Sequence, residues 1–306
     1  MKQKTKGLAQ SVHSRLIRHA KETDVDPNLV LTRFATERLL YRLSQSRFAE
    51  KFVLKGALLL LVWLGESIRP TRDADLLGFG DLADESLVAT FAKICTLGVE
   101  PDGVTFDPSA IHIAAIRPED NYGGKRITLD GQLGSARIRV QLDIGIGDAT
   151  IPEPEWLDYP SLLNMPQPRL LAYRPETAIA EKVHAMVLLG MRNSRLRDFF
   201  DIYVLSRHEP FEGSLLVSAI RATFERRKTV IPEKLPTALT PAFAQAADKR
   251  AQWQGFLRKN HLTIMQIELE DVIASLAEFL GPVLTAASEN NDFKYVWKPS
   301  GPWQAK

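Results

Sequence analysis

Apolar positions near the N-terminus repeat every three or four residues, which is the spacing of one face of an α-helix. Segments 8–22 and 27–43 follow this pattern, and Asp26 before Pro27 supplies a cap and a first-turn residue for the second helix. A third helix is predicted over Ala57–Trp63, ending at Gly65. Helical spacing returns after residue 169. It predicts helices over 175–190, 195–208, 213–227, 241–259 and 267–287.

The middle of the chain has a different pattern, with short runs that are β-branched or that alternate between apolar and polar residues. Glycine-rich joints at 123–124 and 131–134 separate some of these runs, as expected of hairpins. The runs predict strands over 71–79, 111–117, 125–130 and 136–146, with a helix over about 84–97. Together these elements predict an α+β fold, in which a small mixed sheet carries helices on one side and a helical domain follows.

The prolines within residues 151–168 are typical of a linker or a surface strap between two halves. We therefore expect a core with N-terminal helices over 1–168 and a helical domain over 169–288. The final segment, 289–306, lacks periodicity and contains Pro299 and Pro302, which predicts a tail.

The composition is that of a folded globular protein. The 306 residues are 45% hydrophobic and 25% charged, which excludes wholesale disorder and fibrous architectures. The single cysteine, Cys95, excludes an internal disulfide and a thiolate zinc site. The longest apolar run, Ala57–Leu64, is far short of the ~20 residues that a membrane span needs. We therefore expect a cytoplasmic protein with no membrane association.

Charge is unevenly distributed, although the net charge is only +2. Residues 51–168 hold 10 basic and 17 acidic side chains, whereas residues 169–260 hold 16 basic and 9 acidic ones. An acidic middle beside a basic half is what a metal site next to a polyanion-binding surface would produce. Solvated helix faces would give the same counts.

A first candidate for chemistry is Lys55-Gly56-Ala57, at the start of an apolar helix. Glycine lets backbone N–H groups approach a phosphate, and a helix N-terminus favours the anion. A glycine before a helix can also serve backbone geometry alone.

A second candidate is the segment Thr71-Arg72-Asp73-Ala74-Asp75. Residues two apart on a strand point to the same face, so Asp73 and Asp75 present two carboxylates side by side. Such a pair repels unless a cation lies between its members, and Mg²⁺ suits it because this ion binds hard oxygens and substrate phosphates. A pair of this kind is also common in exposed turns.

Asp143 is the third candidate, because it lies between Leu142 and Ile144 in an alternating run. A carboxylate there is costly to bury without a partner, and a metal shared with other carboxylates would supply one. The alternative is an exposed strand position. A glycine before a helix, a paired carboxylate and a later acid are what two-metal nucleotidyl transfer requires.

At these residues the sequence resembles a known superfamily. The order of Gly56, Asp73, Asp75 and Asp143 is similar to that of DNA polymerase beta type nucleotidyltransferases. Two downstream segments, Glu176–Lys182 and Arg192 with Arg197–Tyr203, resemble the AbiEii and MenT toxins, the nucleotidyltransferase components of type IV toxin–antitoxin systems. The resemblance covers roughly residues 30–210.

The resemblance implies transfer of a nucleoside monophosphate from a nucleoside triphosphate to an acceptor, with Mg²⁺ as the cofactor. In some members the acceptor is the 3′ end of tRNA, and a cognate antitoxin protein is a further expected partner. The helical domain is expected to close the nucleotide cleft. The implied metal ligands are Asp73, Asp75 and Asp143, with Asp143 also the candidate general base.

The implied triphosphate site includes Lys182, with Asp198 beside it. Thr71 stands where members often carry a small hydroxyl residue, whereas Ala57 stands where Gly or Ser is usual. That departure removes a side-chain hydrogen bond to phosphate and leaves the backbone donors. The expected nucleotide-binding residues are Lys55, Gly56, Ala57, Thr71, Arg72, Lys182 and Asp201.

The residues themselves leave alternatives open. Asp198 and Asp201 share a helix face near Arg195, so an ion-pair network explains them without a ligand. Lys182 lies among apolar residues and either meets an anion or extends to solvent. Basic residues further on, including Arg221, Arg226 and Arg227, could follow an RNA backbone while nearby aromatic rings stack on bases, or those rings could be core.

Two other functions compete with the nucleotidyltransferase hypothesis. A non-catalytic nucleic-acid-binding or regulatory protein could keep the same fold and use its basic helices. A glycosyltransferase with a DxD pair would also place carboxylates on a metal bound to a nucleotide diphosphate. That second alternative leaves Lys182 and Asp198 unexplained.

Overall fold

The computed structural model describes residues 2–65, 69–116 and 123–306, so residue 117, at the end of one predicted strand, lies outside the described part. The chain forms two compact units. Unit 1 contains residues 1–62, 70–147 and 155–172, and unit 2 contains residues 63–69, 148–154 and 173–306.

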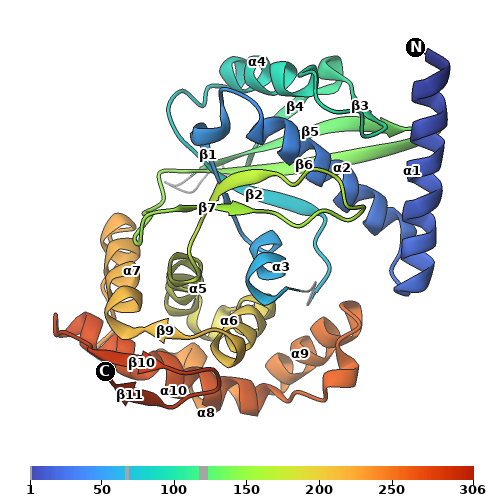
Figure 1. Cartoon of the computed structure of the whole chain (residues 1–306). Coiled ribbons are helices and arrows are strands. Elements are labelled where there is room, and N and C mark those ends of the chain that lie inside the picture. The colour runs from blue at the N-terminus through green and yellow to red at the C-terminus, as the bar shows by residue number, and fades with distance from the viewer. Residues whose placement is uncertain (1, 66–68, 117–122) are drawn as a thin grey trace. The chain divides into compact units, whose positions relative to one another are not determined.

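Unit 1 is built on a mixed sheet (Figure 1). Its strands are β1 (Phe52–Lys55), β2 (Asp73–Gly78), β3 (Val104–Phe106), β4 (His112–Ile116), β5 (Gly124–Leu133), β6 (Ala136–Ile146), β7 (Glu155–Asp158) and β8 (Arg169–Ala172). Its helices are α1 (Lys2–Glu22), α2 (Pro27–Ser44) and α4 (Asp84–Cys95), with 3₁₀ turns at Ala49–Lys51 and Pro108–Ala110. Helix α3 (Leu58–Leu64) begins in unit 1 and ends in unit 2.

The strand order is β3-β5-β6-β2-β1-β8-β7, and β4 pairs with β5. Strands β2 and β6 are parallel, as are β1 and β8, while the other pairs are antiparallel. The sheet has eight strands, so it is larger than the small sheet that the sequence predicts. The segment predicted to be a linker contributes one of them, β7, between its prolines.

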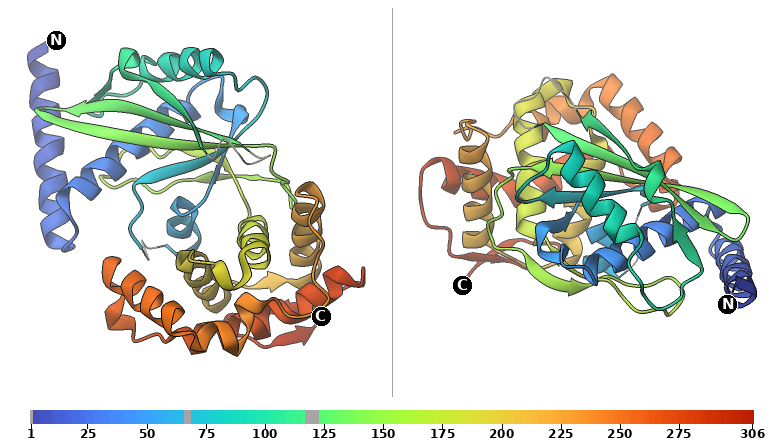
Figure 2. Two further views of the ribbon diagram at one scale, coloured as in Figure 1. Left: turned by 180° about the vertical axis from the view of Figure 1, so that it is seen from behind. Right: turned by 90° about the horizontal axis from the view of Figure 1, so that it is seen from above.

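Helices α2 and α4 lie against one face of this sheet, since α2 packs on β6 and β8, and Phe91 of α4 meets Phe52 of β1. Helix α1 packs on α2 and crosses the end of β5 (Figure 2). Strand β6 shows why the helices choose this face. Its apolar residues Ile138, Val140, Leu142 and Ile144 are buried, and they alternate with the polar residues Arg137, Arg139, Gln141 and Asp143. The polar residues therefore share the opposite face.

Unit 2 is mainly helical. Its helices are α5 (Pro175–Leu189), α6 (Leu196–His208), α7 (Gly213–Arg226), α8 (Pro241–Gln245), α9 (Ala247–Lys259) and α10 (Leu269–Ser288), with 3₁₀ turns at Gly190–Arg192, Thr237–Leu239 and Thr263–Met265. The helix predicted over 241–259 is in fact two, because Ala246 has an extended backbone with ψ of 126°. Helix α10 is long and apolar enough to cross a membrane, but half of it is buried in the protein. Core helices of globular proteins can have the same length and composition.

The final segment is not the tail that its sequence predicts. It forms β10 (Tyr295–Trp297) and β11 (Trp303–Ala305), which pair with β9 (Phe211–Glu212) in a second sheet. Trp297 is buried and donates its indole N–H to the carbonyl of Ser206 at 2.7 Å. Aromatic packing and this hydrogen bond fix the segment to unit 2.

Candidate active site

Gly56 follows strand β1 and has a φ of +75°, a backbone conformation that favours glycine. A Cβ atom added there would lie 2.8 Å from Cγ of Asp75, too close for any side chain. Both the backbone angle and the approach of the carboxylate therefore require glycine at this position. Ala57 follows in the turn before α3, and Lys55 is the cross-strand partner of Asp75.

The sheet register brings the predicted carboxylates to adjacent positions. Asp75 of β2 and Asp143 of β6 are direct cross-strand partners in the parallel pair. Asp73 lies two residues before Asp75 and pairs with Gln141. Because direct partners point to the same side of a sheet, all three carboxylates emerge on the face opposite α2 and α4. Thr71 donates its hydroxyl to Oδ1 of Asp73 at 3.1 Å.

Arg126 of β5 is a further charged residue on this face, and it is the cross-strand partner of Asp143. Its Nε and Nη2 atoms donate to the two Asp143 oxygens at 2.8 and 2.7 Å. Hydrogen bonding by Asp143 raises the pKa of Arg126, and the charges of Asp73 and Asp75 add to this rise. The guanidinium group is therefore a counter-charge to the three carboxylates.

In the described part of the chain, no three His, Cys, Asp or Glu side chains lie close enough together to form a metal site. Arg126 engages both oxygens of Asp143. The donor set nevertheless fits Mg²⁺ in kind, since three carboxylates on neighbouring strands are hard oxygen ligands. Asp143 could join such a site once its bond to Arg126 opens.

Unit 2 holds a separate cluster of buried charges around Lys182 of α5. The Lys182 ammonium donates to Asp198 at 3.1 Å and to Asp201 at 2.8 Å, both on α6. Asp201 also accepts two bonds from Arg69, at 2.7 and 2.9 Å. Nε of Arg195 lies 2.6 Å from Asp198, at ion-pair distance but without hydrogen-bond geometry. The sequence places Arg195 beside these aspartates, as the structure does, but it does not indicate Arg69 as a partner of Asp201.

Burial shapes the titration of this cluster. Burial alone raises the pKa of Asp201, but Lys182 and Arg69 outweigh it and bring that pKa to about 2. For Lys182, burial lowers the pKa, and the two aspartates reverse the shift and raise it. Both carboxylates are about 1% exposed, so the ion-pair explanation of Asp198 and Asp201 describes what the structure contains.

The basic helices differ from the RNA-binding surface that the sequence leaves open. Arg221 donates to the carbonyls of Ala286 and Ala287 at the end of α10. Arg227 pairs with Asp148 at 3.0 Å and is mostly buried. The aromatic rings of Phe224 and Trp253 are buried as well. These side chains make contacts within unit 2. Arg221, Arg227 and the two rings are therefore not part of an RNA-binding surface.

Two arginines of these constellations are missed by sequence reasoning. Arg126 lies in a run predicted as a strand, but its bond to Asp143 depends on which residues pair across β5 and β6. Arg69 precedes Pro70 in an irregular segment and reaches Asp201 across 132 positions of the chain. An alternating pattern indicates a face of a strand and cannot indicate a partner so far away.

Arg72 does not join either constellation in the described structure. Its side chain is 75% exposed and lies 3.5 Å from Asp26. The structure thus brings Lys55, Gly56, Asp73, Asp75, Asp143 and Thr71 together in unit 1, and Lys182, Asp198 and Asp201 together in unit 2.

Two solved structures are similar to this chain in fold. The solved structure of MenT4, a nucleotidyltransferase toxin from Mycobacterium tuberculosis H37Rv, is similar in fold, with a TM-score of 0.54 and 16% identity over 90% of this chain and 98% of that one. A Helicobacter pylori protein described as a nucleotidyltransferase gives a TM-score of 0.50 and 14% identity over 88% of this chain and 100% of that one. No curated protein sequence matches significantly.

A family model supplies the decisive match. The model of the AbiEii nucleotidyl transferase toxin of type IV toxin–antitoxin systems matches residues 38–275, which include both constellations. The match favours a nucleotidyltransferase over the glycosyltransferase that the DxD pair alone allowed. This chain belongs to the AbiEii family of nucleotidyltransferase toxins.

Proposed function

We propose that this protein transfers a nucleoside monophosphate from a nucleoside triphosphate to the 3′ end of an RNA, with tRNA as the first candidate, and that it needs Mg²⁺. Cross-strand pairing of Asp75 with Asp143, with Asp73 two residues along β2, is the observation that carries the proposal. Carboxylates in this register suit an ion shared between a triphosphate and an attacking hydroxyl.

The ion would be held by Asp73, Asp75 and Asp143, and when bound it would offset charge on the phosphates and lower the pKa of the acceptor hydroxyl. Gly56 keeps the space beside Asp75 free of side-chain atoms, so that backbone N–H groups of the turn can approach a phosphate. Ala57 adds no hydroxyl donor. Lys55, Thr71 and Arg72 are the remaining candidates for nucleotide contacts in unit 1.

In the proposed reaction the acceptor oxygen attacks the α-phosphorus in line with the leaving group. The bond from the α-phosphorus to the bridging oxygen breaks, and pyrophosphate leaves with that electron pair. Asp143 takes the proton of the acceptor hydroxyl at one carboxylate oxygen. Arg126 must release that oxygen first, because it engages both in the structure.

Lys182 is the proposed triphosphate contact of unit 2. An ammonium group has three donors, and Asp198 and Asp201 accept from it in the structure. These aspartates fix the position of the amine, so that its charge can meet a phosphate at small cost in side-chain entropy. Asp198 and Asp201 are therefore proposed as positioning residues, and a cognate antitoxin is the proposed protein partner.

The test is transfer itself. Purified protein is incubated with Mg²⁺, total cellular RNA and each α-labelled nucleoside triphosphate in turn, and the labelled RNA is resolved on a gel. We expect one triphosphate to label a discrete RNA class, and we expect loss of the label with chelator. Asp75→Asn should lower the rate by 10³-fold or more, since it removes a shared carboxylate.

A matched control comes from Asp84→Asn. Asp84 is exposed and pairs with Lys125, so this variant also loses one carboxylate without touching the site. It should keep the wild-type rate. Labelling that Asp75→Asn retains in full would reject the enzymatic proposal and would favour the non-catalytic alternative.

A further inference from the structure

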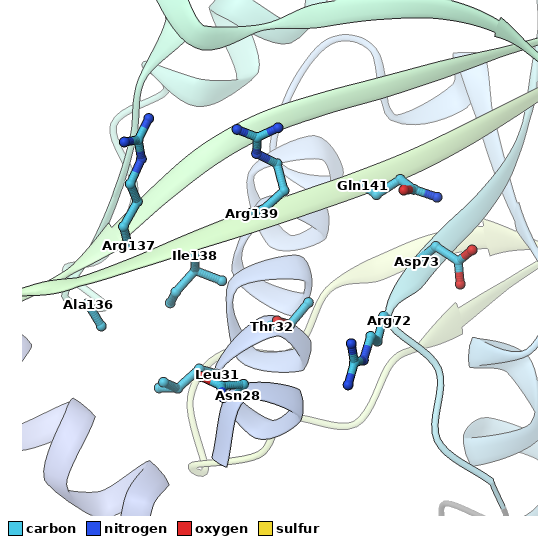
Figure 3. Close-up of a pocket in the computed structure, with 10 residues that line it drawn as sticks. All are labelled: Asn28, Leu31, Thr32, Arg72, Asp73, Ala136, Arg137, Ile138, Arg139 and Gln141. Carbon is cyan, nitrogen blue, oxygen red and sulfur yellow. The ribbon is translucent and has the colours of Figure 1, made fainter. Parts of the chain in front are cut away.

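A groove of about 640 Å³ lies at the Asp73 end of the carboxylate site, within unit 1. Figure 3 shows its lining: Asp73 and Arg72 at one end, strand β6 along one side, and the first turns of α2 along the other. Its size is typical of a site for a small ligand or part of a larger one. The site described above does not use most of its lining.

The floor of this groove is an unpaired strand edge. Strand β6 spans Ala136–Ile146, but β2 pairs with it from Gln141 onward. Over 136–140, no described strand pairs with β6 on the side away from β5. Backbone N–H and C=O groups on that edge are therefore available to a ligand.

Cations border the groove. Arg137 and Arg139 point away from α2 in Figure 3, and their side chains are 78% and 60% exposed. Both donate to a single carboxylate, that of Asp130, so the trio keeps a net positive charge. Arg72, also largely exposed, lies at the Asp73 end. An anionic chain in the groove would meet positive charge at the end that holds Arg137 and Arg139.

We propose that this groove binds the 3′-terminal nucleotides of a single-stranded RNA acceptor and directs the terminal hydroxyl to Asp73. The proposal rests on the proposed function. Phosphates of the acceptor pair with Arg137 and Arg139, and base edges bond to the β6 edge. Residues of a strand advance by ~3.3 Å, so Arg139 lies ~13 Å and Arg137 ~20 Å along the strand from Asp143, a span of a few nucleotides.

Strand order separates this groove from the triphosphate. The sheet runs β6-β2-β1, so the carboxylate strand β2 lies between the groove on the β6 side and the Gly56 turn on the β1 side. The backbone N–H groups of that turn suit the phosphates of the triphosphate. The acceptor would therefore approach the carboxylates from the other side, as transfer between two substrates requires.

An extended peptide could also pair with a free strand edge. The exposed arginines favour RNA instead, because they match a chain with one negative charge at every residue. A protein acceptor remains an outcome of the test.

Binding is measured with a 5′-labelled single-stranded RNA of about ten nucleotides, by fluorescence anisotropy at several salt concentrations. In the double variant Arg137→Glu/Arg139→Glu we expect RNA affinity to fall at least 10-fold. The slope of log affinity against log salt should fall by about 1.4, at ~0.7 for each lost phosphate contact. Binding of each nucleoside triphosphate, measured by calorimetry, should change less than twofold.

The matched control is Arg18→Glu/Arg169→Glu, which reverses two exposed arginines of unit 1 outside the groove lining. It makes the same change in net charge and should keep RNA affinity within about twofold. Because reversal next to Asp130 could unfold the protein, Arg137→Gln/Arg139→Gln is measured beside it. This milder pair should lower RNA affinity in the same direction.

Three results would overturn the proposal: unchanged RNA binding in both groove variants, an equal loss in the control variant, or loss of triphosphate binding with RNA binding intact. Labelling of protein in place of RNA, unaffected by the groove variants, would also overturn it. The assay needs no turnover, so it is independent of the proposed function. RNA binding through the groove without any nucleotide transfer would support the proposed role of the groove and would reject the proposed enzymatic function.

Discussion

Arg126 gives the carboxylate site a built-in cation. Three carboxylates on neighbouring strands repel one another, and a guanidinium that engages Asp143 with two hydrogen bonds offsets this repulsion. Because the Arg126 side chain is 43% exposed, it can move away without leaving a buried charge unpaired. Arg126 and a metal ion could therefore bind the oxygens of Asp143 in turn.

Replacing Arg126 should therefore tighten metal binding. In Arg126→Gln the two oxygens of Asp143 lose their strongest competitor, and a partly exposed pair contributes about 1 kcal/mol. We expect Mn²⁺ affinity, measured by calorimetry, to rise about fivefold.

Lys125→Gln is the control for this measurement. Lys125 is the neighbour of Arg126 in sequence but pairs with Asp84, so its loss removes the same charge without freeing Asp143. Its Mn²⁺ affinity should stay near that of the wild type. Weaker binding by Arg126→Gln would mean that Arg126 holds Asp143 in place for the metal.

The packing of helix α5 against helix α6 depends on ion pairs as well as on apolar contacts. Lys182 bridges the two helices through Asp198 and Asp201, and Arg69 binds the second aspartate from outside the pair. Removal of one partner from a buried group of this kind leaves the others without compensation. Residues expected to contact a nucleotide therefore also stabilise unit 2.

Lys182→Met should lower the free energy of unfolding by about 3–5 kcal/mol, measured by urea titration. The double variant Lys182→Met/Asp198→Asn removes one charge of each sign and leaves Arg69 with Asp201. We expect its loss in free energy of unfolding to be smaller, by about 1–3 kcal/mol, than the sum of the losses in the two single variants. A single variant as stable as the wild type would show that the Lys182 charge is not buried in solution.

The same cluster predicts how stability changes with acid. An unfolded aspartate has a pKa of ~3.9, whereas the pKa of Asp201 is about 2. A depressed pKa adds stability that is fully present above pH ~4 and is lost as the pH falls toward about 2. This contribution to the free energy of unfolding is about 2–3 kcal/mol, because one pKa unit corresponds to about 1.4 kcal/mol. Urea titrations of the wild type and Asp201→Asn should therefore differ most above pH ~4 and converge below it, and a constant difference would contradict this account.

Across the whole chain, the sequence predicts the fold class and the family better than it predicts which strands pair. Alternation places Asp73 and Asp75 on one strand face and Asp143 on another strand, and the α+β class is confirmed by the mixed sheet and by the similarity to MenT4. The register that makes Asp75 and Asp143 neighbours depends on the parallel pairing of β2 with β6. That pairing joins residues about 70 positions apart, and no local pattern encodes it.

Short strands account for most of what the sequence pattern misses. Strand β1 has four residues and continues into an apolar helix, so its pattern is indistinguishable from that of the helix. Strands β10 and β11 have three residues each and are held by the rings of Trp297 and Trp303. Periodicity needs longer runs, whereas aromatic packing can fix a strand of any length.

Membership of a toxin family makes a prediction about cells. Expression of the wild-type chain without an antitoxin should slow bacterial growth, whereas Asp75→Asn at an equal soluble level should not. Asp84→Asn is the control and should slow growth as the wild type does. The measurement is a growth curve of each strain with its soluble protein quantified. If Asp75→Asn inhibits growth as much as the wild type does, toxicity does not depend on nucleotide transfer.

The division into two units has a consequence for how such a protein is synthesised and inherited. Each unit is assembled from separate stretches of chain, and the first unit takes its last strand, β8, from residues 169–172. A nascent chain that has left the ribosome up to β6 has all three carboxylates but lacks β7 and β8 of their sheet. Neither unit is encoded by one continuous gene segment, so a crossover between the codons of residues 70 and 147 would split both units.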